Sequence, residues 1–354
     1  MKILQMVDVP WDSGLAHYAL VLSRALAQAG HQVFVSALPG EKPWDKARRF
    51  GLPTVPLVSL GSLGALRRFL AEERITLINA HTGATHSLAV LSALGRGIAV
   101  VRTRGDARRL RARPTSGLLH ERTHRIIAAA EYIRSQYLDT FRLAPEKVVT
   151  IYQGIDLAAF PWRPPPEAPI LGMVARLDPV KGHRYLLEAI AALAAEGVET
   201  ELRVAGEEAN VTRAELIRLA GKLGVGGRVR FLGWQKELDR FMADCALGVI
   251  SSTASEAVSR VALEWMAAGR PLVATRVGCL PEIVRPEETG VLVEPKSASA
   301  LAEGLRALLR NPAAMARQGG DARAQAEARF SLSRFVQETE RVYAEALAEA
   351  GCRS

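Results

Sequence analysis

Two glutamates, Glu256 and Glu264, are separated by seven residues in a stretch that is otherwise rich in small and apolar side chains. An apolar run at 246–251 predicts a buried strand, and a loop of small residues follows it and ends at Glu256. Glu264 falls within a predicted helix over 259–268, which Gly269 ends. Carboxylates at these positions can accept hydrogen bonds from ligand hydroxyls. Taken alone, two such glutamates more often belong to a loop and a solvated helix face.

The start of the predicted helix is itself a candidate binding feature. In open α/β sheets, ligands bind beyond the carboxyl ends of the strands. A helix that begins there near Ser259 offers unpaired N–H groups and a partial positive charge, which suit a phosphate group. Glu264 lies about one and a half turns further on, too far for the same phosphate but within reach of a ribose hydroxyl.

Two cations form a second candidate cluster. Arg176 and Lys181 follow a predicted strand at 169–176 and precede Gly182, where another helix begins. Arginine presents a planar fork of donors and lysine a compact charge, so the pair can clamp a diphosphate. The alternative is a surface turn with two solvated cations, and the residues alone leave both interpretations open.

The order of these features resembles a known family. The two glutamates are followed by the segment 266–275 (MAAGRPLVAT) and by Gly278-x-x-Pro281. This order resembles the donor-site motif of the retaining glycosyltransferases of family 4, and the resemblance covers essentially the whole chain. It implies a GT-B fold, with Arg176, Lys181 and the helix start at Ser259 around the donor diphosphate. It also implies that Glu256 binds the transferred sugar in catalysis and that Glu264 binds the ribose.

The resemblance assigns further residues with less specific motifs. His81 ends a first-half strand, where family members place a catalytic histidine against the transferred sugar; a lone histidine is otherwise more often structural. Gly14 matches a loop glycine at the donor phosphate or acceptor, although Ser13 stands where the family often has another glycine. Trp234 and Glu207 match positions near the nucleotide base.

One departure limits what the resemblance implies. After the first glutamate the family frequently has glycine, an aromatic residue and glycine, whose backbone contacts sugar hydroxyls. This chain has Ala257-Val258-Ser259 instead. The identity of the transferred sugar therefore does not follow from the sequence.

The chain alternates predicted strands and helices through both halves of its 354 residues, which predicts two parallel, doubly wound sheets. A proline-rich segment at 161–166 separates the halves. We therefore expect an α/β protein with two Rossmann-like domains, and the resemblance implies that they have the GT-B arrangement, facing a cleft. It also implies that residues 1–163 form the acceptor domain, 164–330 the donor domain, and 331–354 a helix that returns to the first domain.

Net charge favours an anionic partner. The formal charge is +9, and six arginines lie between Arg102 and Arg113. We expect Arg102, Arg104, Arg108 and Arg109 to meet a phosphate-bearing acceptor or an anionic membrane; the alternative is a solvated loop. No nucleic-acid-binding module is recognisable, so we expect no nucleic acid partner.

Cysteines and carboxylates give no metal-binding pattern. The three cysteines are widely spaced, and the sequence contains no Asp-x-Asp motif, so we expect neither a metal nor another cofactor. No signal peptide or membrane-length apolar run is visible, which predicts a cytoplasmic protein, with peripheral association at the inner membrane as a further expectation.

The expected function is transfer of a sugar from a nucleotide-diphosphate sugar to an envelope glycan or glycolipid, with lipopolysaccharide core as one such acceptor. The alternatives are a nucleotide-sugar epimerase of the same fold and a non-catalytic partner subunit.

Overall fold

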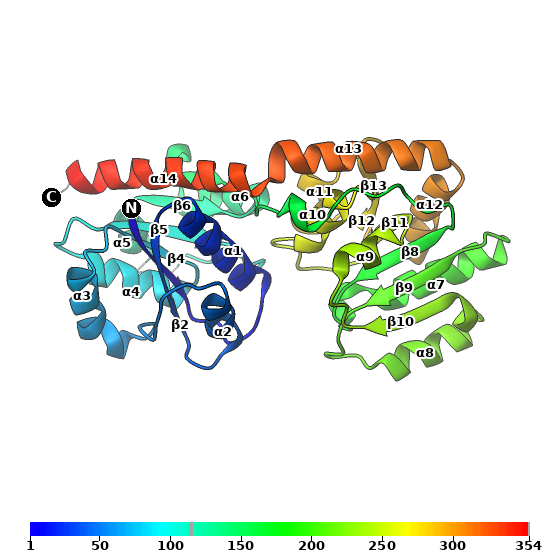
Figure 1. The fold of residues 1–354 in the computed structure, drawn as a ribbon, viewed down its shortest axis with the longest axis horizontal. Coiled ribbons are helices and arrows are strands. Elements are labelled where there is room, and N and C mark those ends of the chain that lie inside the picture. Colours follow the sequence, from blue (N-terminus) through cyan, green and yellow to red (C-terminus); the bar gives the residue numbers. More distant parts are fainter. Residues whose placement is uncertain (113–115, 353–354) are drawn as a thin grey trace. The chain divides into compact units, whose positions relative to one another are not determined.

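The computed structural model describes residues 1–112 and 116–352, apart from the side chain of Cys352. Arg113 and the end of the predicted terminal helix, residues 353–354, lie outside this part. The chain divides into two compact units (Figure 1). The N-terminal unit comprises residues 1–154 and the helix that begins at Leu332, and the C-terminal unit comprises residues 155–331. Each unit is described by itself.

The N-terminal unit contains a parallel sheet in the order β3-β2-β1-β4-β5-β6-β7. Its strands are β1 (Lys2–Val7), β2 (Gln32–Ala37), β3 (Thr54–Val55), β4 (Leu77–Ala80), β5 (Ala99–Arg104), β6 (Arg125–Ala128) and β7 (Val148–Thr150). Its helices are α1 (Gly14–Gln28), α2 (Lys42–Arg49), α3 (Leu63–Glu72), α4 (Gly83–Ala93), α5 (Ser116–Glu121), α6 (Glu131–Phe141) and α14 (Leu332–Cys352). Central strands are buried on both faces, so their apolar runs are continuous.

The C-terminal unit repeats this design with the strand order β10-β9-β8-β11-β12-β13. Its strands are β8 (Ile170–Val174), β9 (Glu201–Ala205), β10 (Val229–Gly233), β11 (Leu247–Ile250), β12 (Leu272–Thr275) and β13 (Gly290–Val293). Its helices are α7 (His183–Ala195), α8 (Arg213–Lys222), α9 (Leu238–Ala243), α10 (Arg260–Ala267), α11 (Leu280–Ile283), α12 (Ala298–Leu309) and α13 (Pro312–Phe330). The neighbouring strands are parallel, as the sequence predicts.

The strand order reverses once in each sheet. In the N-terminal unit the first strand, β1, lies beside the fourth, β4, and in the C-terminal unit β8 lies beside β11. At such a point the loops after the two strands turn to opposite sides of the sheet and leave a crevice at the carboxyl edge. Each unit therefore has one topologically defined place for a ligand.

The helix α14 belongs to the N-terminal unit, in agreement with the fold expected from the sequence. It contacts α1, β5 and β6, and it buries Phe335 and Tyr343. Phe335 packs so closely on Gly154 that a Cβ at residue 154 would lie 2.7 Å from that of Phe335. The chain crosses between the units at two neighbouring points, where Ile155 pairs with Ser331.

The proline-rich segment is packed onto the C-terminal unit. Arg270, which is fully buried, donates from Nη1 to the carbonyl of Arg163 at 3.0 Å and from Nη2 to that of Pro164 at 3.3 Å. The units therefore divide after Gly154, whereas the sequence predicts the boundary after Arg163. Within the described ranges, no helix combines the length and apolar character needed to span a bilayer.

Candidate active site

Two loops meet where the strand order of the C-terminal unit reverses. One follows β8 and carries Lys181, and the other follows β11 and begins at Ser251. Ser251 Oγ donates to the carbonyl of Lys181 at 2.9 Å, and Thr253 N donates to that of Val180 at 2.8 Å. Gly182 has φ +72°, and a Cβ there would lie 1.9 Å from the carbonyl oxygen of Ser251. Only glycine permits this approach.

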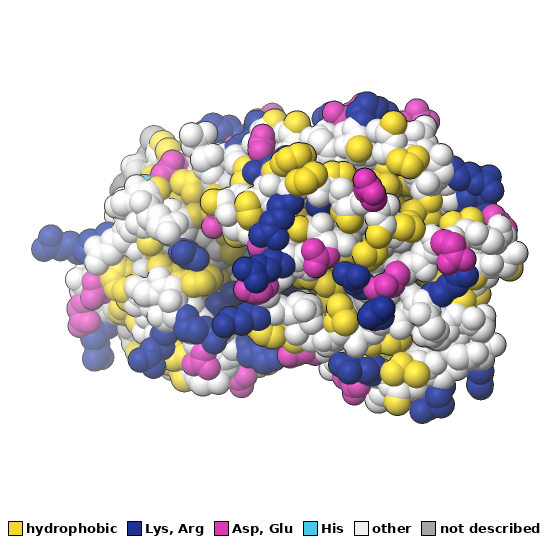
Figure 2. Space-filling view, turned by 45° about the vertical axis from the view of Figure 1, so that its right-hand side comes forward, with side chains coloured by type: hydrophobic (Ala, Val, Ile, Leu, Met, Phe, Trp, Pro, Cys, Tyr) yellow, Lys and Arg dark blue, Asp and Glu magenta, His cyan; other side chains and the backbone are white. Residues whose placement is uncertain are grey.

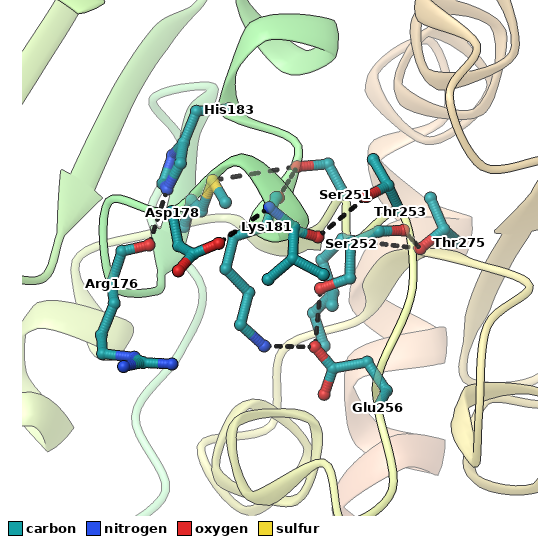
Figure 3. A network of polar contacts seen from close by, with 12 residues as sticks. Arg176, Asp178, Lys181, His183, Ser251, Ser252, Thr253, Glu256 and Thr275 are labelled. Atoms are coloured by element: carbon teal, nitrogen blue, oxygen red, sulfur yellow. Dashed lines mark hydrogen bonds and ion pairs between the residues drawn. The ribbon is translucent and has the colours of Figure 1, made fainter. Parts of the chain in front are cut away.

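These contacts bring Lys181 and Glu256 together (Figure 3). Lys181 Nζ lies 2.6 Å from Glu256 Oε1, and Ser252 Oγ donates to the same oxygen at 2.6 Å. The Glu256 side chain is 5% exposed and that of Lys181 is 22% exposed. Both contacts fall on Oε1, so Oε2 is the carboxylate oxygen left for a ligand. Because Nζ carries three hydrogens, Lys181 can hold Glu256 and still donate to a phosphate.

The backbone of Glu256 is held by the loop that precedes α11. Cys279 N donates to the carbonyl of Glu256 at 2.7 Å. Gly278 has φ +54°, and a Cβ there would lie 2.0 Å from the same carbonyl oxygen. The Gly278-x-x-Pro281 segment therefore supports Glu256 from behind.

Arg176 lies at the edge of the same site. Its side chain is exposed and makes no ion pair within the described part of the chain. His183 Nε2 donates to its carbonyl at 2.9 Å, which fixes the backbone. Figure 3 shows the Arg176 and Lys181 side chains extending in the same direction. The two cations are thus placed to contact one anionic group.

Asp178 holds the turn between the two cations. Its carboxylate accepts from Val180 N at 3.0 Å and from Asn210 Nδ2 at 2.6 Å. The Val180 hydrogen bond lowers the pKa of Asp178 most, and burial opposes this effect. Asp178 therefore stays ionised and positions Lys181.

The helix α10 begins beside Glu256. Ser259 is its N-cap residue and is 2% exposed, and its Oγ has no hydrogen-bond partner among the described residues. A buried hydroxyl without a partner costs about 1–3 kcal/mol, which a bound phosphate would relieve. Glu264 lies buried in the second turn, with Oε1 3.2 Å from Arg260 Nε.

The two residues assigned to the base lie on the neighbouring strand ends. The carbonyl of Glu207 accepts from Leu177 N at 2.8 Å, so this segment lies beside the Arg176 loop. Gly206 N donates to the carbonyl of Gly233 at 2.8 Å, which places Trp234 one strand further along the same edge. The Trp234 side chain is 65% exposed.

In the N-terminal unit, His81 and Gly14 follow β4 and β1, the two strands at the other reversal point. His81 is fully buried, and its Nε2 lies 2.8 Å from Gln5 Oε1. Burial, and then the charge of Arg102, lower the pKa of His81 to about 3, so the ring is neutral near pH 7. Gly14 is the first residue of α1, and Ser13 caps this helix by accepting from Ala16 N at 3.2 Å.

The Arg-rich segment is not a uniform basic surface. Arg102 is 2% exposed and donates to the carbonyls of Ala80 and Thr103, so the expectation of an exposed anion-binding role is wrong for this residue. It lies within β5, where the strand is still covered. Arg104 pairs with Asp106 at 3.0 Å, whereas Arg108 and Arg109 are exposed.

Sequence reasoning missed several residues that shape the site. Ser252 lies in no distinctive motif, and Thr275, the last residue of the segment 266–275, has no individual role in the motif; Thr275 Oγ1 donates to the carbonyl of Ser252 at 2.6 Å. Asp178-Pro179 is a recognisable helix start, with a capping residue followed by proline at the first position. That signal could have identified Asp178.

Two Rossmann-type units, each with candidate ligand residues where its strand order reverses, define the GT-B fold class. HepE from Anabaena, solved in complex with UDP, has this fold: its TM-score is 0.83 at 19% identity, with 97% of this chain and 100% of that chain covered. In the sequence, residues 13–159 match the family described as Glycosyltransferase Family 4, and residues 154–325 match Glycosyl transferases group 1. The chain is therefore a glycosyltransferase whose first half matches the family 4 model and whose second half matches the group 1 model.

Named relatives cover only part of the chain. A D-inositol 3-phosphate glycosyltransferase of Corynebacterium glutamicum is 33% identical over 184 residues, which are 51% of this chain and 44% of the relative. The lipopolysaccharide core biosynthesis glycosyltransferase LpsE of Rhizobium meliloti is 37% identical over 145 residues, 41% of each chain. The alignments thus span about half the length of these relatives.

Proposed function

We propose that this protein is a retaining glycosyltransferase that moves a sugar from a nucleotide-diphosphate sugar to an envelope glycan or glycolipid. The observation that carries the proposal is the contact of Lys181 with Glu256 beside Arg176, at the reversal point of a Rossmann-type sheet. A phosphate-binding cation and a hydroxyl-binding carboxylate lie side by side there, as a nucleotide-diphosphate sugar requires.

The reaction breaks a sugar–phosphate bond, so negative charge develops on the leaving diphosphate. Arg176, Lys181 and the N-terminal amides of α10 are fixed before the reaction and stabilise that charge where it forms. Glu256 Oε2 accepts from a sugar hydroxyl and favours the oxocarbenium-like centre, and Glu264 binds the ribose. An oxygen of the leaving phosphate takes the proton of the acceptor, so no side chain is assigned as a general base.

Relatives suggest the classes of donor and acceptor. HepE was solved with UDP, which supports a uridine nucleotide as the first donor to test. LpsE is named for lipopolysaccharide core biosynthesis, which supports an envelope acceptor. We propose that the reaction needs no metal, because two cations already face the diphosphate, and that the protein works in the cytoplasm.

The donor is identified by thermal stabilisation with UDP, GDP, ADP and their sugars in the presence of EDTA. A ligand that binds only the folded state stabilises it by RT ln(1 + [L]/Kd), about 2.7 kcal/mol at a hundredfold excess over Kd. One nucleotide should stand out. Glu264→Gln should weaken its effect, whereas Glu188→Gln should not, because Arg184 and Glu188 form the same helical pair elsewhere.

Turnover distinguishes the alternatives. Transfer with retention gives a product whose new linkage has the anomeric configuration of the donor, measurable by NMR. Nucleotide diphosphate released at full rate without acceptor would favour the epimerase, and a folded protein that binds no nucleotide would favour a non-catalytic subunit. Abolition of donor binding by EDTA would contradict metal-independent action.

We assign binding of the acceptor, or of an anionic membrane, to the exposed part of the Arg-rich segment. Basic residues near an anionic membrane contribute about 1 kcal/mol each. Basic and acidic side chains are intermixed on the face in Figure 2, so net charge alone does not decide. Arg108→Glu/Arg109→Glu should weaken binding to anionic vesicles at low salt. The exposed pair Arg48→Glu/Arg49→Glu on α2 is the matched control. If both double variants lost vesicle binding equally, non-specific charge attraction would explain the binding.

A further inference from the structure

A chain of hydrogen-bonded side chains runs through the interior of the N-terminal unit and ends at His81. Tyr343 Oη accepts from Asn79 Nδ2 at 2.7 Å and from Gln5 Nε2 at 3.1 Å. Thr103 Oγ1 lies 2.9 Å from Asn79 Oδ1, and Gln5 Oε1 lies 2.8 Å from His81 Nε2. All five side chains belong to residues no more than 1% exposed. They come from β1, the end of β4, β5 and α14.

The direction of these hydrogen bonds determines which ring nitrogen of His81 carries the proton. Gln5 turns its NH₂ group toward Tyr343, so its carbonyl oxygen faces His81. A carbonyl oxygen only accepts, so His81 Nε2 must be the N–H donor. A neutral imidazole has one N–H, which leaves Nδ1 with a lone pair.

Nδ1 is also the ring nitrogen that has no hydrogen-bond partner among the described residues, although it is buried. A buried acceptor without a hydrogen-bond partner destabilises the protein unless a ligand donates to it. A lone pair cannot bind a phosphate oxygen, which is itself an acceptor. It binds an O–H group.

We propose that Tyr343 is a positioning residue that acts through Gln5 to keep His81 in the Nε2–H form and to present Nδ1 to a sugar hydroxyl. This assignment rests on the proposed glycosyl transfer for its ligand. A hydroxyl that donates to Nδ1 gains electron density and so favours a nearby oxocarbenium-like centre. The other tautomer would direct an N–H dipole at that centre and oppose it.

The tautomer is measured directly in the full-length protein labelled with ¹⁵N-histidine. The NMR experiment correlates the carbon-bound protons of each imidazole ring with Nδ1 and Nε2. His81→Gln identifies the His81 signals. We expect Nε2–H in the ligand-free wild type. In Tyr343→Phe, Gln5 loses its acceptor and can turn its NH₂ group toward His81, so the Nδ1–H form should appear.

Tyr18→Phe is the matched control. It also removes a buried phenolic hydroxyl, which donates to the carbonyl of Ile151 at 2.9 Å outside this chain of side chains. Loss of packing or stability alone would affect both variants and would not move the tautomer. We expect Tyr343→Phe to lower kcat about tenfold, the value of one hydrogen bond, with donor KM changed less than about twofold.

An Nδ1–H signal from His81 in the wild-type protein would by itself overturn the proposal. Persistence of Nε2–H in folded Tyr343→Phe would also overturn it, as would unchanged kcat despite a changed tautomer. Failure of the glycosyltransferase assignment is distinguishable, because it would appear as no turnover in wild-type protein whose tautomer is as expected.

Discussion

Replacement of Lys181 by methionine separates the structural and catalytic parts of the ion pair with Glu256. Methionine keeps the length of the side chain and removes the charge. The Glu256 carboxylate, 5% exposed, would then keep only the hydrogen bond from Ser252 on its Oε1. Breaking a fully buried pair costs about 3–5 kcal/mol, and an exposed pair is worth about 0–1 kcal/mol.

The 22% exposure of Lys181 places this pair between those limits, so we expect a loss of about 2 kcal/mol. For a unit of this size that corresponds to a fall in Tm of about 4–8 °C. In the double variant Lys181→Met/Glu256→Gln no charge is left unpaired, so most of the lost stability should return. Denaturant unfolding of the wild type, the two single variants and the double variant measures this coupling.

Catalysis should not return with stability. Loss of one fixed charge stabiliser lowers kcat about 10²–10³-fold, and the double variant also lacks the Glu256 charge. Arg184→Met removes a 73% exposed cation from the helix that follows Lys181, and it should leave both stability and kcat unchanged. A folded Lys181→Met protein with wild-type stability and turnover would refute the reasoning on both counts.

Three further predictions concern single residues. Ser259→Ala should leave the ligand-free protein no less stable and raise donor KM about three- to tenfold, because its hydroxyl has no hydrogen-bond partner in the part of the chain that the structure describes; isothermal titration and kinetics measure this. Gly182→Ala should destabilise the protein by more than about 1 kcal/mol, because its Cβ would meet the carbonyl of Ser251 at 1.9 Å; a Tm equal to that of Gly197→Ala, also at positive φ but in open space, would contradict this. The pKa of His81 is lowered to about 3, so the unfolded state binds its proton first and stability falls as pH decreases from about 6.5 toward 3. His81→Gln should reduce the change of the free energy of unfolding with pH by up to about 1.4 kcal/mol per pH unit; urea unfolding at a series of pH values measures this.

The sequence predicts the fold well where burial is strong. Buried parallel strands are continuous apolar runs, so β8, β9, β11 and β12 could be located without the structure. Two surface helices do not follow from the apolar pattern: α2 is short and buries only Pro43 and Ala47, and the buried face of α13 consists largely of small and polar residues such as Gln318 and Gly319. For the same reason the terminal region was predicted as one helix from residue 331, without α13 before it.

The site divides in a similar way. Lys181 and Glu256 could each be proposed from local motifs, but their contact could not, because it depends on β8 and β11 being neighbours in the sheet. Arg102 was misplaced because a run of arginines predicts a surface, and strand position overrides that pattern. Tyr343 carried no signal at all, since its partners Gln5 and Asn79 are hundreds of residues away in the chain.

The place of α14 also bears on how the chain folds during synthesis. The C-terminal unit is one continuous segment, so it can fold as soon as residues 155–331 have left the ribosome. The N-terminal unit emerges earlier, but α14, which supplies Tyr343 to the buried amides of Gln5 and Asn79, is the last of the described helices to be synthesised. Domains usually fold in the order in which they emerge. Here we expect the first half of the nascent chain to complete its core only after the C-terminal unit has been made, and to stay accessible to chaperones and proteases until then.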